Sequence, residues 1–238
     1  MSSTRLPGKV LANINEKPMI YWQINRIKEA KKIDELVVAT STDQSDDALA
    51  NYLQQNGVLV ERGSTDNVLE RFLQVLVRLK EYENIVRLTA DCPLVMPELI
   101  DEMISKFENS NIDYLSNSIE PTFPDGLDIE IMKRAALIRL WDHPLSIVET
   151  EHVTLGLRNR ASDFVVENFS QLNDLSNLRW TVDYEGDLEF VRKIYAEFKG
   201  NEVRFNYQDL LRLLKAKPEL TNRISGNLRN VAIKENQE

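Results

Sequence analysis

The chain has 238 residues, enough for one sizeable domain or for one domain with a small appendage. Its 29 basic and 38 acidic residues give a net charge of −9, which argues against a general nucleic-acid binder because such proteins present a large basic face. A single cysteine excludes an internal disulfide and fits a reducing cytoplasm, and no apolar run approaches the ~18 residues of a membrane span.

The first ten residues have the character of a basic phosphate-binding loop. Arg5 and Lys9 are separated by Leu-Pro-Gly, and because Pro fixes one φ and Gly frees the next, the segment favours a shaped turn. Ser3 and Thr4 add hydroxyls and backbone donors, and a turn with two cations suits a polyphosphate. The alternative interpretation is a solvated chain end.

Helices and strands are predicted to alternate over the first 110 residues. Helical spacing of apolar residues, with Asp66 as one N-cap, predicts helices over 18–30, 44–56, 67–81 and 97–109. Short β-branched runs predict strands over 35–40, 58–61 and 84–89. This alternation predicts a parallel sheet with helices on both faces.

The middle of the chain departs from that alternation. Strands are predicted over 114–117 and 165–169, and helices over 134–143 and 147–159. Residues 127–132 alternate apolar and acidic side chains, which is the period of a half-exposed strand. We expect 118–172 to form a β-hairpin-and-helix insertion and a dimer surface. The last part returns to the first pattern, with a strand over 178–182 and helices over 185–198 and 206–215.

Asp91 and Asp183 each follow a predicted strand. Ligands of open α/β sheets lie outside the carboxyl ends of the strands, so we expect these carboxylates to converge there, opposite the basic loop. Such a pair suits Mg²⁺ bound to phosphates. Each Asp taken alone also fits a helix N-cap or a turn.

Seven short motifs occur in a fixed order. They are Arg5-Leu-Pro-Gly-Lys9, Lys17-Pro-Met19, Gly63-Ser64 ahead of Asp66-Asn-Val-Leu69, Thr89-Ala-Asp-Cys-Pro-Leu94, Pro124-Asp-Gly-Leu-Asp128, Glu151-His-Val-Thr154 and Leu178-Arg-Trp-Thr-Val-Asp183. Together they resemble the spore-coat-polysaccharide-type cytidylyltransferases, relatives of the enzymes that make CMP-Kdo and CMP-sialic acids. The resemblance covers roughly residues 1–200.

The resemblance implies a three-layer α/β/α fold of the GT-A-like nucleotidyltransferase type, with a mostly parallel central sheet. It implies a homodimeric, Mg²⁺-dependent enzyme that transfers CMP from CTP to a sugar and releases pyrophosphate. The nucleotidyltransferase domain is expected over 1–200, including the insertion at 118–172, with a helical extension and polar tail over 201–238.

Residue by residue, the resemblance assigns three groups. Arg5, Lys9, Asp91 and Asp183 match the catalytic positions, and the two Asp match the metal ligands. The nucleotide-binding positions are Ser3, Thr4, Arg5, Lys9, Gly63, Asp66, Asn67 and Asp91. The sugar-side positions are Asp125, Asp128, Glu130, Glu151 and His152. No residue is identified as a general base. The identity of the sugar is not determined, and kinship suggests Kdo- and sialate-like 2-keto acids.

One part of the family pattern is absent. In the family an apolar strand ending in Gln-Ala-Arg precedes the phosphate loop, whereas Met1 stands here where the loop begins. A parallel sheet without that strand has a gap lined with unpaired backbone groups. We expect either that translation starts upstream and Met1 is internal, or that the chain is a truncated, inactive copy.

Two other functions stay open. A GT-A glycosyltransferase usually presents Asp-x-Asp after a strand, whereas this chain has Asp91-Cys-Pro. A non-catalytic nucleotide-binding or partner protein would keep the motifs and lack the chemistry. Arg158, Arg160 and Arg179 could clamp a sugar carboxylate, although the first two also fit ordinary surface arginines.

Three single residues have two interpretations each. Cys92 fits a nucleophile or a small buried residue at a strand end. His152 fits a sugar ligand or base, or a packing residue. Trp180 fits a core residue or a platform for a base.

Overall fold

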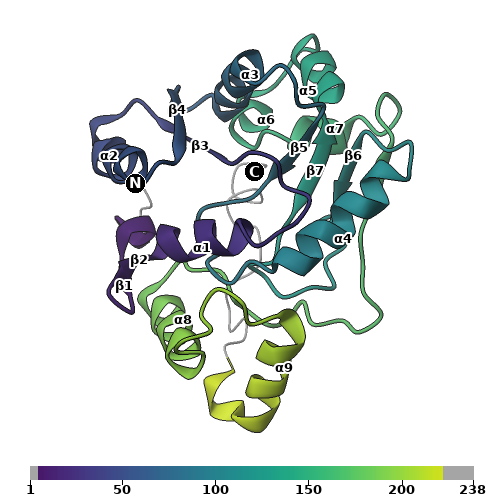
Figure 1. The fold of residues 1–238 in the computed structure, drawn as a ribbon. Coiled ribbons are helices and arrows are strands. Elements are labelled where there is room, and N and C mark those ends of the chain that lie inside the picture. The colour runs from purple at the N-terminus through teal and green to yellow at the C-terminus, as the bar shows by residue number, and fades with distance from the viewer. Residues whose placement is uncertain (1–4, 222–238) are drawn as a thin grey trace.

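The computed structural model describes residues 5–221, whose strands lie between two layers of helices (Figure 1). The strands are β1 (Asn13–Ile14), β2 (Lys17–Pro18), β3 (Val37–Ser41), β4 (Leu59–Gly63), β5 (Asn84–Arg87), β6 (Tyr114–Ser116), β7 (Glu130–Lys133) and β8 (Val166–Asn168). The helices are α1 (Met19–Ile27), α2 (Asp47–Gln55), α3 (Val68–Arg78), α4 (Pro97–Glu108), α5 (Arg134–Trp141), α6 (Ile147–Glu151), α7 (Leu155–Asn159), α8 (Glu185–Glu197) and α9 (Tyr207–Ala216). Short 3₁₀ turns are η1 (Lys9–Leu11), η2 (Gln44–Asp46) and η3 (Pro218–Leu220).

The strands form two separate main sheets. β3 pairs with β4 in parallel, and the second sheet has the order β5-β7-β6-β8. In that sheet β6 and β8 are parallel, whereas β7 runs antiparallel to both of its neighbours. Figure 1 shows β3 and β4 on one side of the molecule and β5, β7 and β6 on the other. β1 and β2 form a small hairpin of their own.

The position of β7 corrects the prediction of a half-exposed strand over 127–132. Glu130, Ile131 and Met132 are all buried, because β7 lies between β5 and β6. The acidic side chain of Glu130 is buried because Arg87 on β5 neutralises it and Tyr114 donates a hydrogen bond of 2.6 Å to it. The alternation of apolar and acidic residues thus reflects a buried ion pair rather than a solvent-facing edge.

Three further predictions were wrong in detail. The helix over 147–159 is two helices, α6 and α7, because Val153 between them has φ +40°. The N-cap of α3 is Asn67 rather than Asp66, since the Asn67 side chain accepts the Glu70 N–H at 2.9 Å. Residues 178–182 form no regular strand and pair only through an isolated bridge between Asp125 and Arg179.

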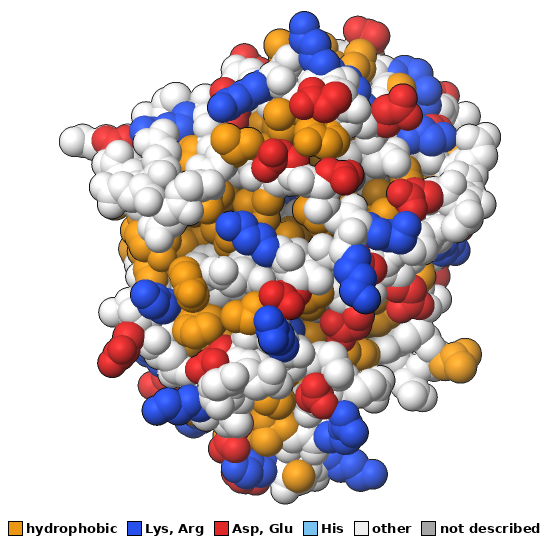
Figure 2. Space-filling view, viewed as in Figure 1, with side chains coloured by type: hydrophobic (Ala, Val, Ile, Leu, Met, Phe, Trp, Pro, Cys, Tyr) orange, Lys and Arg blue, Asp and Glu red, His pale blue; other side chains and the backbone are white. Residues whose placement is uncertain are grey.

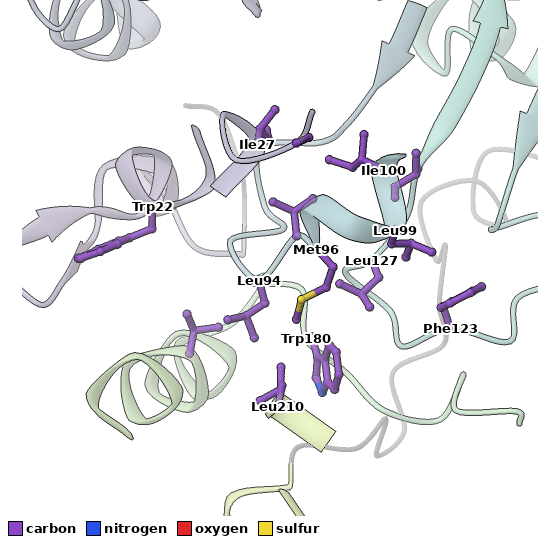
Figure 3. Packing of buried hydrophobic residues seen from close by; sticks show 14 of the residues in the cluster. Trp22, Ile27, Leu94, Met96, Leu99, Ile100, Phe123, Leu127, Trp180 and Leu210 are labelled. Atoms are coloured by element: carbon purple, nitrogen blue, oxygen red, sulfur yellow. The ribbon is translucent and has the colours of Figure 1, made fainter. Parts of the chain in front are cut away.

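The largest apolar cluster lies between the sheet and the layer of α1, α4, α8 and α9. Trp180 is fully buried there, which places it in the core. Figure 3 shows Trp180 with Met96, Leu127 and Leu210 around it. A second cluster, with Leu69 of α3, packs on the other face of the β5–β8 sheet. No helix within 5–221 has the length and apolar character needed to cross a membrane.

Arg26 on α1 connects the C-terminal helices to the rest of the fold. Its side chain is fully buried, and the guanidinium donates to the carbonyls of Val95 (2.8 Å), Glu202 (3.1 Å) and Phe205 (3.0 Å). It also lies 3.9 Å from the centre of the Phe205 ring. A buried guanidinium with several carbonyl partners holds distant backbone segments in one position.

We expect Arg26→Ala to lower the free energy of unfolding by roughly 3 kcal/mol, because several buried carbonyls lose their donor. Urea unfolding followed by circular dichroism measures the change. The matched control is Arg204→Ala, since Arg204 is 77% exposed and its contact with Glu29 is long at 3.6 Å. The control is expected to change stability by less than about 0.5 kcal/mol. Equal effects of the two substitutions would contradict this role of Arg26.

The start of α6 carries a pH-dependent contribution to stability. Ser146 and Glu149 form a capping box, and Arg160 donates to Glu149 at 2.5 Å. The hydrogen bond from Arg160 is the main cause that lowers the pKa of Glu149 to about 2. A carboxyl with a lowered folded-state pKa stabilises the fold above its ordinary pKa, and that stabilisation is lost as the pH falls towards the lowered value.

We therefore expect the stability difference between the wild type and Arg160→Gln to be larger at pH 6 than at pH 3. Urea unfolding at both pH values gives the two differences, and Arg158→Gln is the control for removing a nearby positive charge. The same difference at pH 6 and pH 3 would show that Arg160 does not act through the Glu149 carboxylate.

Candidate active site

The ammonium of Lys9 lies between two carboxylates from distant parts of the chain. It donates to Asp91 Oδ2 at 3.3 Å and to Asp183 Oδ1 at 2.9 Å, and its third contact is the Val182 carbonyl at 2.7 Å. Only 10% of the Lys9 side chain is exposed, compared with 28% for Asp91. The structure therefore brings together three of the four residues predicted to be catalytic around one buried positive charge.

Local backbone structure presents these side chains. Gly8 has φ +73°, a left-handed conformation that suits glycine, and it starts the turn η1 that carries Lys9. Asp91 follows β5, and its carbonyl accepts the Val182 N–H at 2.8 Å and the Thr181 hydroxyl at 3.2 Å. Asp91 is thereby held beside the segment that leads into Asp183.

Arg5, the fourth residue, lies on the exposed side of the cluster. Its guanidinium is 3.0 Å from Asp183 Oδ1 and 5.4 Å from the centre of the Tyr184 ring. The Arg5 side chain is 40% exposed, so this cation is open to a ligand, whereas Lys9 is mostly enclosed. The two cations therefore bracket the same carboxylate, one from the interior and one from the surface.

A buried arginine holds Asp183 from behind. Arg179 donates to Asp183 Oδ2 at 2.9 Å, to Asp125 Oδ2 at 2.9 Å and to both oxygens of Asp187. Asp187 also accepts the backbone N–H groups of Asp183 and Tyr184. Arg179 therefore pairs internally rather than lying free to clamp a sugar.

The charges around Asp183 decide its protonation. Burial acts to raise its pKa, but the positive charge of Lys9 and the hydrogen bonds from Lys9 and Arg179 together lower it. Burial acts to lower the pKa of Arg179, but the hydrogen bonds that its guanidinium donates to Asp187 and Asp183 raise that pKa. Asp183 is therefore an ionised carboxylate at neutral pH, held in a fixed orientation.

Asp91 and Asp183 could also hold a divalent cation. Residues 5–221 contain no group of three or more His, Cys, Asp or Glu side chains arranged to bind a metal. The two carboxylates nevertheless converge on one point, which the Lys9 ammonium marks. Two carboxylates suit Mg²⁺, because this ion completes its coordination shell with water molecules and phosphate oxygens. It does not require a site made of protein ligands alone.

The predicted nucleotide-side residues form a second group at the end of β4 and the start of α3. Ser3 and Thr4 lie outside the described residues. Gly63 is buried, and a Cβ there would come within 2.8 Å of the Arg71 side chain and 2.6 Å of Gln74 Oε1. Asp66 is exposed, and Asn67 caps α3.

The predicted sugar-side residues are not all placed alike. Asp125 is buried beside Arg179, and Asp128 is half-buried. Glu151 is exposed at the end of α6. His152 is half-buried, burial lowers its pKa, and its Nε2 atom has no hydrogen-bond partner within 5–221.

Glu130, the fifth sugar-side candidate, is a buried acceptor of several bonds. Besides Arg87 and Tyr114, the Thr154 hydroxyl donates to it at 2.5 Å. Burial acts to raise its pKa, and the Arg87 charge with these hydrogen bonds lowers it. Its oxygens are thus engaged by the protein itself.

Sequence reasoning missed the residues that orient the two carboxylates. Thr89 donates to Asp91 Oδ1 at 2.5 Å, and Asp187 anchors Arg179. The four-residue spacing of Arg179, Asp183 and Asp187 was a readable signal for one charge cluster. Cys92 is buried, and burial raises the pKa of its thiol well above its usual range, so it is a poor nucleophile.

Comparison with known proteins shows the family of this chain. The family described as "Cytidylyltransferase" matches residues 1–205. The spore coat polysaccharide biosynthesis protein SpsF of Bacillus subtilis is 32% identical over 228 residues, which cover 92% of each chain. The structure of a cytidylyltransferase from Leptospira borgpetersenii has a TM-score of 0.88 at 29% identity, covering 96% of this chain and 95% of that one.

A more distant structure shows the same fold. CMP:2-keto-3-deoxy-manno-octonic acid synthetase in complex with CTP has a TM-score of 0.63 at 20% identity, covering 82% of this chain and 95% of that chain. These likenesses confirm the predicted α/β nucleotidyltransferase fold. The family match over residues 1–205, the 32% identity to SpsF over 92% of each chain and the shared fold show that this chain belongs to the cytidylyltransferase family.

Proposed function

We propose that this protein transfers CMP from CTP to a sugar, with release of pyrophosphate, for the synthesis of a surface or spore-coat polysaccharide. The observation that carries the proposal is the convergence of Arg5, Lys9, Asp91 and Asp183 in a chain of this family. The relationship to SpsF supports the polysaccharide, and the synthetase bound to CTP supports the nucleotide. Family membership favours nucleotidyl transfer over the glycosyltransferase alternative.

The two cations and two carboxylates have separate roles in this reaction. The sugar hydroxyl attacks the α-phosphorus of CTP in line, and the bond to the leaving pyrophosphate breaks. Arg5 is exposed enough to bind the triphosphate directly, and Lys9 neutralises charge from the enclosed side. Such a reaction depends mainly on positioning and on stabilisation of developing negative charge.

Asp91 and Asp183 would hold the Mg²⁺ ion. When bound, Mg²⁺ offsets phosphate charge and makes the attacking hydroxyl easier to deprotonate, so that no separate general base is needed. Arg179 and Thr89 are positioning residues, because each holds one of the two carboxylates by a short hydrogen bond. Pairing with Lys9 holds both carboxylates beside each other before the nucleotide arrives.

The remaining candidates flank this centre. We propose that Gly63, Asp66 and Asn67, at the start of α3, lie on the nucleoside side. Asp128, Glu151 and His152 are proposed for the sugar side, with Asp125 and Glu130 supporting that side from the interior through Arg179 and Arg87. The name of the synthetase relative supports a sugar acid as the acceptor.

We expect Lys9→Ala and Asp91→Ala each to lower turnover by roughly 100-fold or more, the scale of losing a key electrostatic stabiliser. The assay is pyrophosphate release with Mg²⁺ and CTP, compared with UTP, ATP and GTP, across a panel of sugars that includes 2-keto acids. Lys106→Ala, which removes a surface lysine paired with Glu167, is the control and is expected to keep wild-type turnover. Near-native pyrophosphate release by either folded site variant would refute the assignment.

One observation favours a second candidate, a nucleotide-binding protein without turnover. A cavity of about 570 Å³ lies between β3 and β5, and Thr89 and Ala90, just before Asp91, form part of its wall. The segment that leads into Asp91 thus faces unfilled space on one side, and catalysis is more sensitive than binding to imperfect positioning. The same assay separates the two functions, because this second candidate is stabilised by Mg-CTP in a thermal shift and releases no pyrophosphate.

We also propose a homodimer formed through residues 118–172, in a cytoplasmic enzyme. Of the large apolar residues that are exposed within 5–221, all but Val77 belong to that segment. They are Ile138, Trp141, Ile147, Val165 and Leu172, of which Ile147 is 82% exposed. Exposed apolar residues gathered in one segment are typical of an interface with a second copy of the chain.

We expect Trp141→Glu combined with Ile147→Glu to raise the dimer dissociation constant by roughly 100-fold, because burying unpaired carboxylates costs several kcal/mol. Light scattering coupled to size exclusion gives the mass over a range of concentrations. Val77→Glu, on α3 and 66% exposed, is the control and is expected to leave the mass unchanged. A wild-type monomer, or a double variant as dimeric as the wild type, would count against this interface.

A further inference from the structure

The Lys9 ammonium fills the place where the side chains of Asp91 and Asp183, here called the carboxylate pair, face each other. It lies 3.3 Å from Asp91 Oδ2 and 2.9 Å from Asp183 Oδ1, and it donates to the Val182 carbonyl at 2.7 Å. An ammonium has three N–H groups, so these three contacts use all of them. Because only 10% of the Lys9 side chain is exposed, this positive charge is built into the carboxylate pair.

The other oxygen of each carboxylate also has a partner. Asp91 Oδ1 accepts the Thr89 hydroxyl at 2.5 Å, and Asp183 Oδ2 accepts the Arg179 guanidinium at 2.9 Å. A cation that bridges the two carboxylates therefore has to use the two oxygens that face each other. The Lys9 ammonium lies between these two atoms, so it and a bridging cation need the same space.

The backbone of Lys9 is fixed, whereas its side chain has rotatable bonds. The turn η1 holds the backbone, because the Lys9 N–H donates to the Leu6 carbonyl at 3.2 Å and the Ala12 N–H donates to the Lys9 carbonyl at 3.0 Å. A lysine side chain is a flexible stem with a compact charge at its end. The ammonium can therefore move to another acceptor while the loop keeps its shape.

A triphosphate supplies such an acceptor next to the ammonium. The Arg5 side chain is 40% exposed, and a guanidinium of this kind suits phosphate oxygens. Arg5 and Lys9 both contact Asp183 Oδ1, at 3.0 Å and 2.9 Å, so their charged ends are neighbours. A phosphate group that binds Arg5 therefore arrives beside the Lys9 ammonium.

A divalent cation without a nucleotide supplies no such acceptor. If it entered the carboxylate pair, Lys9 would lose both carboxylates and keep only the Val182 carbonyl, although its side chain is mostly enclosed. An enclosed charge that has lost its partners is costly. This cost opposes the binding of a free divalent cation.

The overall charge of the protein does not keep free cations away from the carboxylate pair. The net charge is −9, and an acidic protein attracts cations. Figure 2 shows Lys and Arg side chains interspersed with Asp and Glu side chains over one face, rather than gathered into one positive area. Exclusion of cations from the carboxylate pair therefore depends on a local charge.

We propose that Lys9 excludes divalent cations from the carboxylate pair until a nucleoside triphosphate is bound, and that phosphate oxygens then accept its ammonium. Metal and nucleotide consequently bind together rather than one after the other. The inference rests on the proposed CMP transfer for the identity of these two ligands. It adds the condition under which the two carboxylates become available to a metal ion.

Binding of Mn²⁺ to the full chain without any nucleotide tests this role of Lys9. Lys9→Met removes the ammonium and keeps an unbranched stem. We expect it to bind one Mn²⁺ at least about 10-fold more tightly than the wild type, because a competing charge is removed. Electron paramagnetic resonance of the free ion during a titration gives the dissociation constants. Lys106→Met, which removes a surface lysine paired with Glu167, is the control and is expected to bind Mn²⁺ as the wild type does.

Substitution of Asp91 shows whether the effect belongs to the carboxylate pair. Asp91→Asn combined with Lys9→Met is expected to abolish the gain in affinity, because one carboxylate is missing. Asp91→Asn alone is expected to leave Mn²⁺ binding without nucleotide unchanged, because Lys9 already excludes the ion. With CTP present, the same single substitution is expected to weaken Mn²⁺ binding by roughly 10-fold, because Lys9 has then moved to phosphate. These two comparisons test the proposal even if Lys9→Met does not fold.

Three results would overturn the proposal. They are equal Mn²⁺ affinities of the wild type and a folded Lys9→Met, a gain that survives Asp91→Asn, and a wild type whose nucleotide-free Mn²⁺ binding is weakened by Asp91→Asn. The nucleotide-free measurements need no turnover, so the two proposals fail separately. Pyrophosphate release by a wild type that gives one of these results leaves CMP transfer supported. A wild type that gives the expected Mn²⁺ results and releases no pyrophosphate with any sugar refutes CMP transfer alone.

Discussion

The charge chain from Lys9 through Asp183 to Arg179 is the interaction on which the site depends. Each member is largely buried, and each is neutralised by the next: Lys9 by Asp91 and Asp183, and Arg179 by Asp183, Asp125 and Asp187. Removing one member leaves a charge in a low-dielectric place without its partner, which costs more than the pair contributes. The ion pairs that neutralise these buried charges therefore also hold the side chains of the candidate active site in place.

This chain of charges also connects segments that are distant in sequence. The loop at Lys9, the end of β5 at Asp91 and the start of α8 after Asp183 meet through side chains and through the hydrogen bond from Val182 to Asp91. Neither main sheet supplies this contact by strand pairing. The site is therefore assembled by ion pairs and hydrogen bonds between loops, outside the strand pairing of the two sheets.

The sequence alone identified the charged residues of the site, but not the residues that contact them. Asp91 and Asp183 were expected together because each follows a predicted strand. They do meet, although residues 178–182 form no regular strand and reach Asp91 through backbone hydrogen bonds instead. The burial of Glu130 could not be predicted, since its partner Arg87 lies 43 residues away. Tertiary packing also overrode local preference at Val153, where a β-branched residue adopts φ +40° and ends α6. The proposed roles of the nucleotide-side and sugar-side residues stay predictions.

The hydrogen bonds of Arg26 have a consequence for where the chain can be cut. The family match ends at residue 205, yet Arg26 binds carbonyls at 202–205, and Leu210 and Leu214 of α9 belong to the same core cluster as α1. The C-terminal helices and the N-terminal helix thus form one cooperative unit. A shortened version ending near residue 200 would leave the buried guanidinium of Arg26 without several of its carbonyl partners and would expose the main core. Tags and fusions therefore belong beyond residue 221.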